Sequence, residues 1–140
     1  MVSQSIEIKA TPKRCFQIIT DYEKYPDFIK DLKTVKVTNK KGSGCDVTYE
    51  IDVIKRISYS LKMKTTPPDR IEWSFIRGDV MKDNQGFWDL EEIKKGVTKA
   101  TYNINVKFGL FVPEMVTKAL VGKNLPAMLE SFKKRIEDQN

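Results

Sequence analysis

The sequence of 140 residues contains no histidine and only two cysteines, Cys15 and Cys45. Without histidine the chain supplies no imidazole general base, no Ser–His or Cys–His nucleophile pair and no histidine-containing zinc site. The two cysteines lack CxxC spacing, so we expect reduced thiols, with a disulfide as the less favoured alternative. We therefore predict no metal and no cofactor, and assign no catalytic residue.

Long apolar runs are missing too. No stretch of about 18 apolar residues is present to span a membrane, and the N-terminus lacks the apolar segment of a signal peptide. We expect one domain over residues 1–140 in the cytoplasm, with peripheral membrane association left open. The net charge of +6 permits contact with anionic lipid, ribosomal RNA or acidic protein. Lys30 to Lys41 is the densest basic stretch, but Asp27 and Asp31 are mixed into it. A solvated strand face is thus favoured over a nucleic-acid surface, and DNA is not an expected partner.

From Leu32 to Phe108 apolar and polar residues alternate. Cys45 to Val53 shows the pattern most clearly, with apolar residues at odd positions and polar ones between them. Such runs recur along the chain, separated by turns at Gly42–Gly44, Pro67-Pro68 and Lys94–Gly96. This periodicity predicts an antiparallel sheet with one apolar and one polar face, covered on one side only.

Helical signals stand at both ends of this region. Thr11 reads as an N-cap with Pro12 at the first helical position, and this helix should end near Asp21. Tyr22 to Ile29, which contains Pro26, should form a second short helix or a tight turn. Val112 to Glu137 has an apolar face at helical spacing. Its internal Pro126 predicts a kink near Gly122 to Pro126, or two short helices that meet there.

The order of these elements is strand, two short helices, several strands and one long helix. Because antiparallel sheets twist and coil, a strip of six to seven strands should curve around the last helix. The sequence therefore predicts an α+β fold of the helix-grip type, with the C-terminal helix as the cover of the curved sheet.

The inward positions of the predicted sheet are rich in aromatic residues and methionine. They could simply fill a core. However, one helix laid across a curved sheet cannot reach every inward side chain, and the remaining gap would suit an apolar ligand. The tyrosine hydroxyls could orient an oxygen of such a ligand, or bond to backbone or water. The expected ligand-binding residues are Tyr49, Tyr59, Met63, Trp73, Phe75, Trp88, Tyr102, Ile104, Met115, Leu120 and Met128.

The mouth of such a cavity is expected at Tyr25, Phe28 and Arg77. By strand parity Arg77 points inward, where a pair with Asp79 could bind a polar headgroup. An ordinary surface ion pair is the favoured alternative. Cys15 reads as a small buried residue rather than a nucleophile, because no base is available to activate it.

Several motifs resemble one known family. They are Thr11 to Phe16, Asp21 to Phe28 with its Tyr-Pro-Asp-Phe turn, Gly86 to Trp88, Thr98 to Tyr102, Val112-Pro113 and Leu125-Pro126. Together they resemble the polyketide cyclase/coenzyme Q-binding branch of the START-like (SRPBCC) superfamily over essentially the whole chain. The resemblance implies a helix-grip domain that binds a hydrophobic small molecule. Ile29 to Leu32 differs from the quinone-binding and ribosome-directed relatives, so no subfamily is assigned.

Three functions are compatible with these observations. The first is a non-enzymatic carrier or chaperone of a respiratory quinone, lipid or polyketide, which the lack of converging acid–base groups favours over catalysis. The second is a cyclase or dehydratase in which tyrosines and Arg77 steer an enolate, although the sequence has no histidine and no converging carboxylates for acid–base catalysis. The third is an interaction protein that docks on a ribosome or membrane through Lys33 and Lys36.

Overall fold

A computed structural model describes residues 2–53, 55–110, 112–118 and 124–139. The strands are β1 (Val2–Ile8), β2 (Leu32–Lys41), β3 (Gly44–Val53), β4 (Lys55–Thr66), β5 (Arg70–Gly78), β6 (Met81–Lys94) and β7 (Val97–Phe108). The helices are α1 (Pro12–Ile19), the 3-10 helix η1 (Tyr22–Asp27), α2 (Glu114–Lys118) and α3 (Asn124–Asp138). The element order predicted from the sequence is confirmed.

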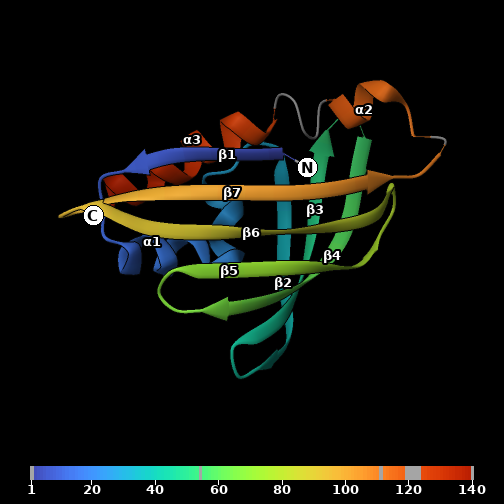
Figure 1. The fold of residues 1–140 in the computed structure, drawn as a ribbon. Helices are drawn as coiled ribbons and strands as arrows, with labels where there is room; N and C mark the ends of the chain where they lie inside the picture. Colours follow the sequence, from blue (N-terminus) through green and yellow to red (C-terminus); the bar gives the residue numbers. More distant parts are fainter. Residues whose placement is uncertain (1, 54, 111, 119–123, 140) are drawn as a thin grey trace.

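The strands form one antiparallel sheet in the order β1-β7-β6-β5-β4-β3-β2. In Figure 1, β1, β5, β6 and β7 run across the view while β2 and β3 stand nearly upright, so the sheet is strongly curved. Helices α1 and α3 lie on its concave side. This is the predicted helix-grip architecture: a curved sheet wrapped around a C-terminal helix.

The first turn of α1 follows the expected capping chemistry. The Thr11 Oγ1 accepts a hydrogen bond from the Arg14 N–H at 3.2 Å, and Pro12 occupies the first turn, where its missing N–H costs nothing. Cys15 and Ile19 face the interior and are fully buried. Burial also raises the pKa of the Cys15 thiol, which disfavours the reactive thiolate. Cys15 is therefore a packing residue of the core.

The C-terminal helical region consists of two described segments, α2 and α3. Pro126 lies in the first turn of α3, where no intrahelical bond is lost. The predicted break at Gly122 falls in residues 119–123, outside the described part of the chain. Leu125, Leu129, Phe132 and Ile136 recur at helical spacing and are all buried against the sheet.

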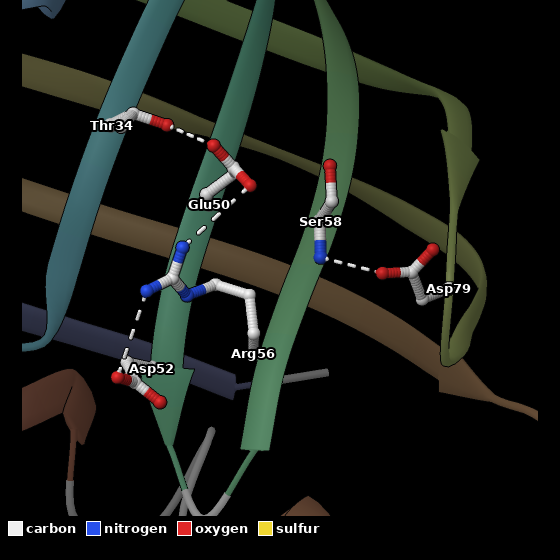
Figure 2. Close-up of polar contacts among 6 residues, drawn as sticks. All are labelled: Thr34, Glu50, Asp52, Arg56, Ser58 and Asp79. Carbon is white, nitrogen blue, oxygen red and sulfur yellow. Dashed lines mark hydrogen bonds and ion pairs between the residues drawn. The ribbon is translucent and has the colours of Figure 1, made fainter.

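The convex face of the sheet is polar, as the alternation predicted. Figure 2 shows its outward side chains on β2, β3 and β4. Thr34 donates a hydrogen bond to Glu50 at 2.6 Å, and Arg56 lies 3.9 Å from both Glu50 and Asp52. These pairs are about half exposed and contribute little stability, but they keep this face in water.

Candidate functional site

A cavity of about 420 Å³ lies between the concave face of the sheet and α3. Its size is in the range of small-molecule sites. Its walls are mostly apolar and aromatic, which suits a hydrophobic occupant. The described lining residues are Tyr25, Ile29, Lys30, Asp31, Leu32, Tyr49, Ile51, Tyr59, Leu61, Met63, Trp73, Met81, Asn84, Trp88, Tyr102, Ile104, Val106, Phe108, Leu125, Ala127, Met128, Ser131 and Phe132.

Most of the residues expected to bind a ligand border this cavity. They are Tyr49, Tyr59, Met63, Trp73, Trp88, Tyr102, Ile104 and Met128, together with Tyr25 of the predicted mouth. Those on strands point inward at every second position, as the alternation predicted, while Met128 comes from α3 and Tyr25 from η1. Leu120, also expected there, lies outside the described residues.

Aromatic rings form a continuous arc around the cavity. Tyr49 and Tyr59 come from neighbouring strands and stack with ring centroids 5.1 Å apart. Across the cavity, the Trp88 ring meets Tyr102 at 4.9 Å and Phe132 of α3 at 5.3 Å, both edge to face. Such geometry is favourable for aromatic pairs and holds these side chains in one arrangement.

The tyrosine hydroxyls divide into two kinds. The Tyr25 hydroxyl donates a hydrogen bond to the Ile19 carbonyl and is therefore structural. Within the described residues, the hydroxyls of Tyr49, Tyr59 and Tyr102 make no hydrogen bond to protein, although all three side chains border the cavity. They are the donors and acceptors available to a ligand.

Burial keeps these hydroxyls protonated. It raises the pKa of Tyr59 to about 12, and it raises the pKa of Tyr49 and of Tyr102 well above the ordinary value. A tyrosine with a raised pKa is a poor proton acceptor at neutral pH. The three side chains are thus suited to donate hydrogen bonds to ligand oxygens rather than to act as general bases.

Asn84 is a buried polar group of the site that the sequence reasoning missed. Its Oδ1 accepts a hydrogen bond from the Trp73 indole N–H at 3.0 Å. This bond satisfies the only polar atom of the indole and fixes its orientation. Asn84 shares the inward parity of Gly86 and Trp88 on β6, so extending the predicted strand by two residues would have found it.

Gly86 permits the close approach of Trp73 to β6. A Cβ at this position would lie 2.1 Å from the Asn103 carbonyl oxygen and 2.6 Å from the Trp73 ring. Any larger residue would therefore disrupt the pairing of β6 with β7 or push aside the Trp73 indole that borders the cavity.

The mouth of the cavity differs from the prediction. Tyr25 borders the cavity, whereas Phe28 packs behind it against Tyr25 and Phe132, at 5.9 and 5.3 Å between ring centroids. The residues that follow Phe28 take its place, because Lys30 and Asp31 line the cavity where η1 leads into β2. Exposed Ala127 of α3 lines the same cavity, so we define the mouth as Lys30, Asp31 and Ala127.

The inward orientation predicted for Arg77 is wrong. Arg77 pairs with Ser60, whereas Phe75 pairs with the next residue, Leu61. The extra residue is a bulge that reverses the inward–outward alternation, so Arg77 is exposed and does not border the cavity. Nor does it pair with Asp79, whose carboxylate accepts a hydrogen bond from the Ser58 N–H at 2.8 Å (Figure 2).

Two further expected ligand residues do not border the cavity. Phe75 is half-buried against the main core and against a smaller cluster under α2. Its ring lies over Gly78, where an added Cβ would be 3.2 Å away. Met115 is 70 % exposed, because α2 buries its neighbour Val116 and consecutive helical residues point about 100° apart.

Within the described ranges no helix is long and apolar enough to cross a membrane. Nor do three histidine, cysteine, aspartate or glutamate side chains of this part of the chain gather as a metal site would require. The charged side chains among the described lining residues are Lys30 and Asp31, both at the mouth. The interior of the site is thus neutral, apolar and hydroxyl-bearing.

The fold is shared with several solved structures. The Zhui aromatase/cyclase from Streptomyces sp. R1128 superposes with a TM-score of 0.88 at 14% identity, covering 97% of this chain and 92% of that chain. For a START superfamily protein from Mycobacterium smegmatis the TM-score is 0.85 at 18% identity, over 99% and 98% of the two chains. For the STAR-related lipid transfer protein from Xanthomonas axonopodis it is 0.78 at 10% identity, over 96% and 84%.

No curated protein matches the sequence. A family model does, and its match extends over residues 8–133. It describes polyketide cyclases, dehydrases and lipid transport proteins. With the curved seven-stranded sheet, the C-terminal helix and the cavity between them, this match shows that the chain belongs to the START-like polyketide cyclase/dehydrase and lipid transport family.

Proposed function

We propose that this protein binds and carries a hydrophobic small molecule, such as a respiratory quinone or a lipid, without transforming it. The observation that carries the proposal is the neutral cavity of about 420 Å³, in which three tyrosine hydroxyls have no protein partner within the described residues. An apolar molecule gains free energy by leaving water for such walls, at roughly 25 cal/mol per Å² of apolar surface. Its oxygens would receive hydrogen bonds from the tyrosines.

The chemistry of the cavity supports binding over a cyclase or dehydratase reaction. Acid–base catalysis needs groups whose pKa lies near the working pH. The interior tyrosines have raised pKa values, and the one lining carboxylate, Asp31, lies at the mouth among the residues the structure describes. Hydrogen bonds from neutral hydroxyls orient a ligand, but they do not move its protons.

The route into the cavity follows from the position of its exposed lining residues. Lys30 and Ala127 are the exposed members, and they belong to the η1–β2 connection and to α3. We therefore place the entry between these two segments. Contact with a ribosome or membrane remains a separate prediction. Lys33 and Lys36 are exposed on β2, an edge strand, where lysines also discourage pairing with other chains.

The proposal is tested by asking whether the cavity holds an apolar molecule. Freshly purified protein is extracted with organic solvent and the extract identified by mass spectrometry, while oleic acid and a short-tailed ubiquinone are added to stripped protein and the melting temperature is recorded. We expect a co-purified apolar molecule, or a rise in melting temperature with one of the two probes. Empty extracts together with unchanged melting temperatures would overturn the proposal.

A matched pair of variants locates the site. Ala127→Phe places a ring at the mouth, whereas Glu130→Phe adds the same ring to the exposed side of α3, away from the cavity. The first should reduce probe binding by about tenfold or more and the second should leave it unchanged. Equal effects of the two substitutions would place binding elsewhere.

A further inference from the structure

A second cavity, of about 300 Å³, lies on the other side of Met63. It is bounded by the end of α1, by η1, by the β2–β3 hairpin and by the end of β4. Its lining residues are Phe16, Thr20, Asp21, Tyr22, Glu23, Val37, Lys40, Gly42, Ser43, Gly44, Cys45, Met63 and Thr65. Among the described residues, Met63 lines both cavities and stands between them.

The wall between the two cavities is thin. Met63 pairs directly with Cys45 across β3 and β4, and Cys45 lines the second cavity only. Beside them, Tyr22 and Tyr25 pack edge to face with ring centroids 5.9 Å apart. Tyr25 borders the main cavity and Tyr22 the second, so these two side chains of η1 continue the partition. Methionine is unbranched and flexible, which suits it to move aside.

The second cavity contains an unsatisfied hydrogen-bonding group. Tyr22 is 6 % exposed, and its hydroxyl is buried without a partner among the described residues. Buried hydroxyls are almost always bonded, so this unpaired donor is available to an oxygen atom of a ligand or of a water. Burial also raises the pKa of Tyr22, which keeps the hydroxyl protonated as a donor.

We propose that the two cavities form one ligand site divided by Met63, and that its ligand is an apolar molecule with a long flexible tail carrying an oxygen acceptor. The body of the ligand occupies the main cavity, its tail passes Met63, and the tail oxygen accepts a hydrogen bond from Tyr22. This inference rests on the proposed function, because it extends the same binding site.

Two natural reporters follow ligand binding. Both tryptophans of the sequence, Trp73 and Trp88, border the main cavity, so energy transfer from tryptophan reports that a probe is bound. Cys45 borders the second cavity and is partly accessible, while Cys15 is fully buried and borders neither. The rate of Cys45 labelling therefore reports the second cavity, with Cys15 as an internal control for intact folding.

The experiment compares two fluorescent probes on the full chain. Dansylamide carries the fluorophore alone, and dansylaminoundecanoic acid adds a long chain with a terminal carboxyl. We expect both to accept energy from tryptophan, and only the long probe to slow N-ethylmaleimide labelling of Cys45 by about fivefold or more at saturation. Peptide mass spectrometry assigns the labelled cysteine.

Two variants outside the main cavity sharpen the result. Val37→Phe fills the second cavity and should bring the affinity of the long probe down to that of dansylamide. Tyr22→Phe removes only the hydroxyl and should weaken the long probe by about fivefold while leaving dansylamide unchanged.

Failure of this inference can be distinguished from failure of the proposed function. Energy transfer with both probes and an unprotected Cys45 would overturn this inference alone. Long-probe affinity that is unchanged by Val37→Phe would do the same. No energy transfer with either probe would overturn the proposed function, and this inference with it.

Discussion

The two ends of the concave surface are both apolar, but they are packed differently. Toward the C-terminus of α3, Ile136 lies in the core with Ile8, Cys15 and Ala100, all fully buried, and none of these four residues borders a cavity. Toward its N-terminus, Leu125 and Met128 border the cavity. We call these regions the filled end and the hollow end.

The difference follows from what covers the sheet. At the filled end α1 packs against β6, β7 and α3, while α3 packs against β1, with small residues such as Cys15 and Ala100 in the core between these elements. The Thr98 hydroxyl donates a hydrogen bond to the Ala10 carbonyl at 2.7 Å, which ties the turn before α1 to β7. At the hollow end the described part of α3 faces large rings on a curving sheet without α1 beside it, and a straight helix cannot follow the curve. The packing density of each end thus depends on which helices cover the strands and on the size of the side chains between them.

The largest expected contrast is in core truncation. Ile136→Ala at the filled end should destabilise the protein by about 3 kcal/mol, because the close packing leaves the new cavity unfilled. Met128→Ala at the hollow end should cost less than about 1 kcal/mol, since this side chain is half-buried beside existing space. Denaturant unfolding measures both. Equal losses would show that the two ends are equally packed.

A second contrast concerns the backbone beneath Trp73. Gly86→Ala should destabilise the protein by about 2 kcal/mol, because the added methyl meets the Asn103 carbonyl and the Trp73 ring. It should also change the tryptophan fluorescence, since the indole must move. Gly42→Ala, in the open β2–β3 turn with φ 58°, is the comparison. It should cost about 1 kcal/mol with the fluorescence unchanged.

A third contrast separates bonded from unbonded hydroxyls. Tyr25→Phe should destabilise the protein by about 1 kcal/mol, because the Ile19 carbonyl loses its buried donor. Tyr59→Phe should change stability by less than about 0.5 kcal/mol, since its hydroxyl has no protein partner in the described chain. Thermal unfolding distinguishes them. A destabilised Tyr59→Phe variant would assign that hydroxyl a structural role.

The smallest expected effect comes from removing the polar clamp at the filled end, which consists of Glu137 and its partners Lys9 and Lys133. The Glu137 carboxylate accepts a hydrogen bond from the Lys9 N–H at 2.8 Å and lies 3.4 Å from Lys133. The backbone bond and Lys133 lower the pKa of Glu137 below 4.5. A lowered pKa means that the clamp contributes above about pH 4.5 and that its contribution is lost as the pH falls through the folded-state pKa.

Glu137→Gln should therefore cost about 0.5 kcal/mol at neutral pH, where the pair is partly screened by water. The difference from the wild type should shrink toward pH 3, which denaturant unfolding across that range measures. A difference independent of pH would assign the effect to packing.

The sheet and its inner face could be predicted because alternation is a local signal. Residues such as Tyr49 and Trp88 follow strand parity, and both lie inward. Arg77 could not be placed, because the bulge opposite Ser60 reverses the parity and depends on pairing between two strands. Met115 could not be placed either, since the ends of α2 decide which side of it faces inward.

By itself the sequence determined the order of elements, the polar and apolar faces of the sheet and the aromatic character of the interior, because each depends on residues near in the chain. Only the tertiary structure decided where the interior is filled and where it is hollow. That outcome depends on which helices cover which strands and on the small side chains where they approach. It also decided that Met63 stands between two cavities, since this arrangement joins β4 to η1 and to the β2–β3 hairpin.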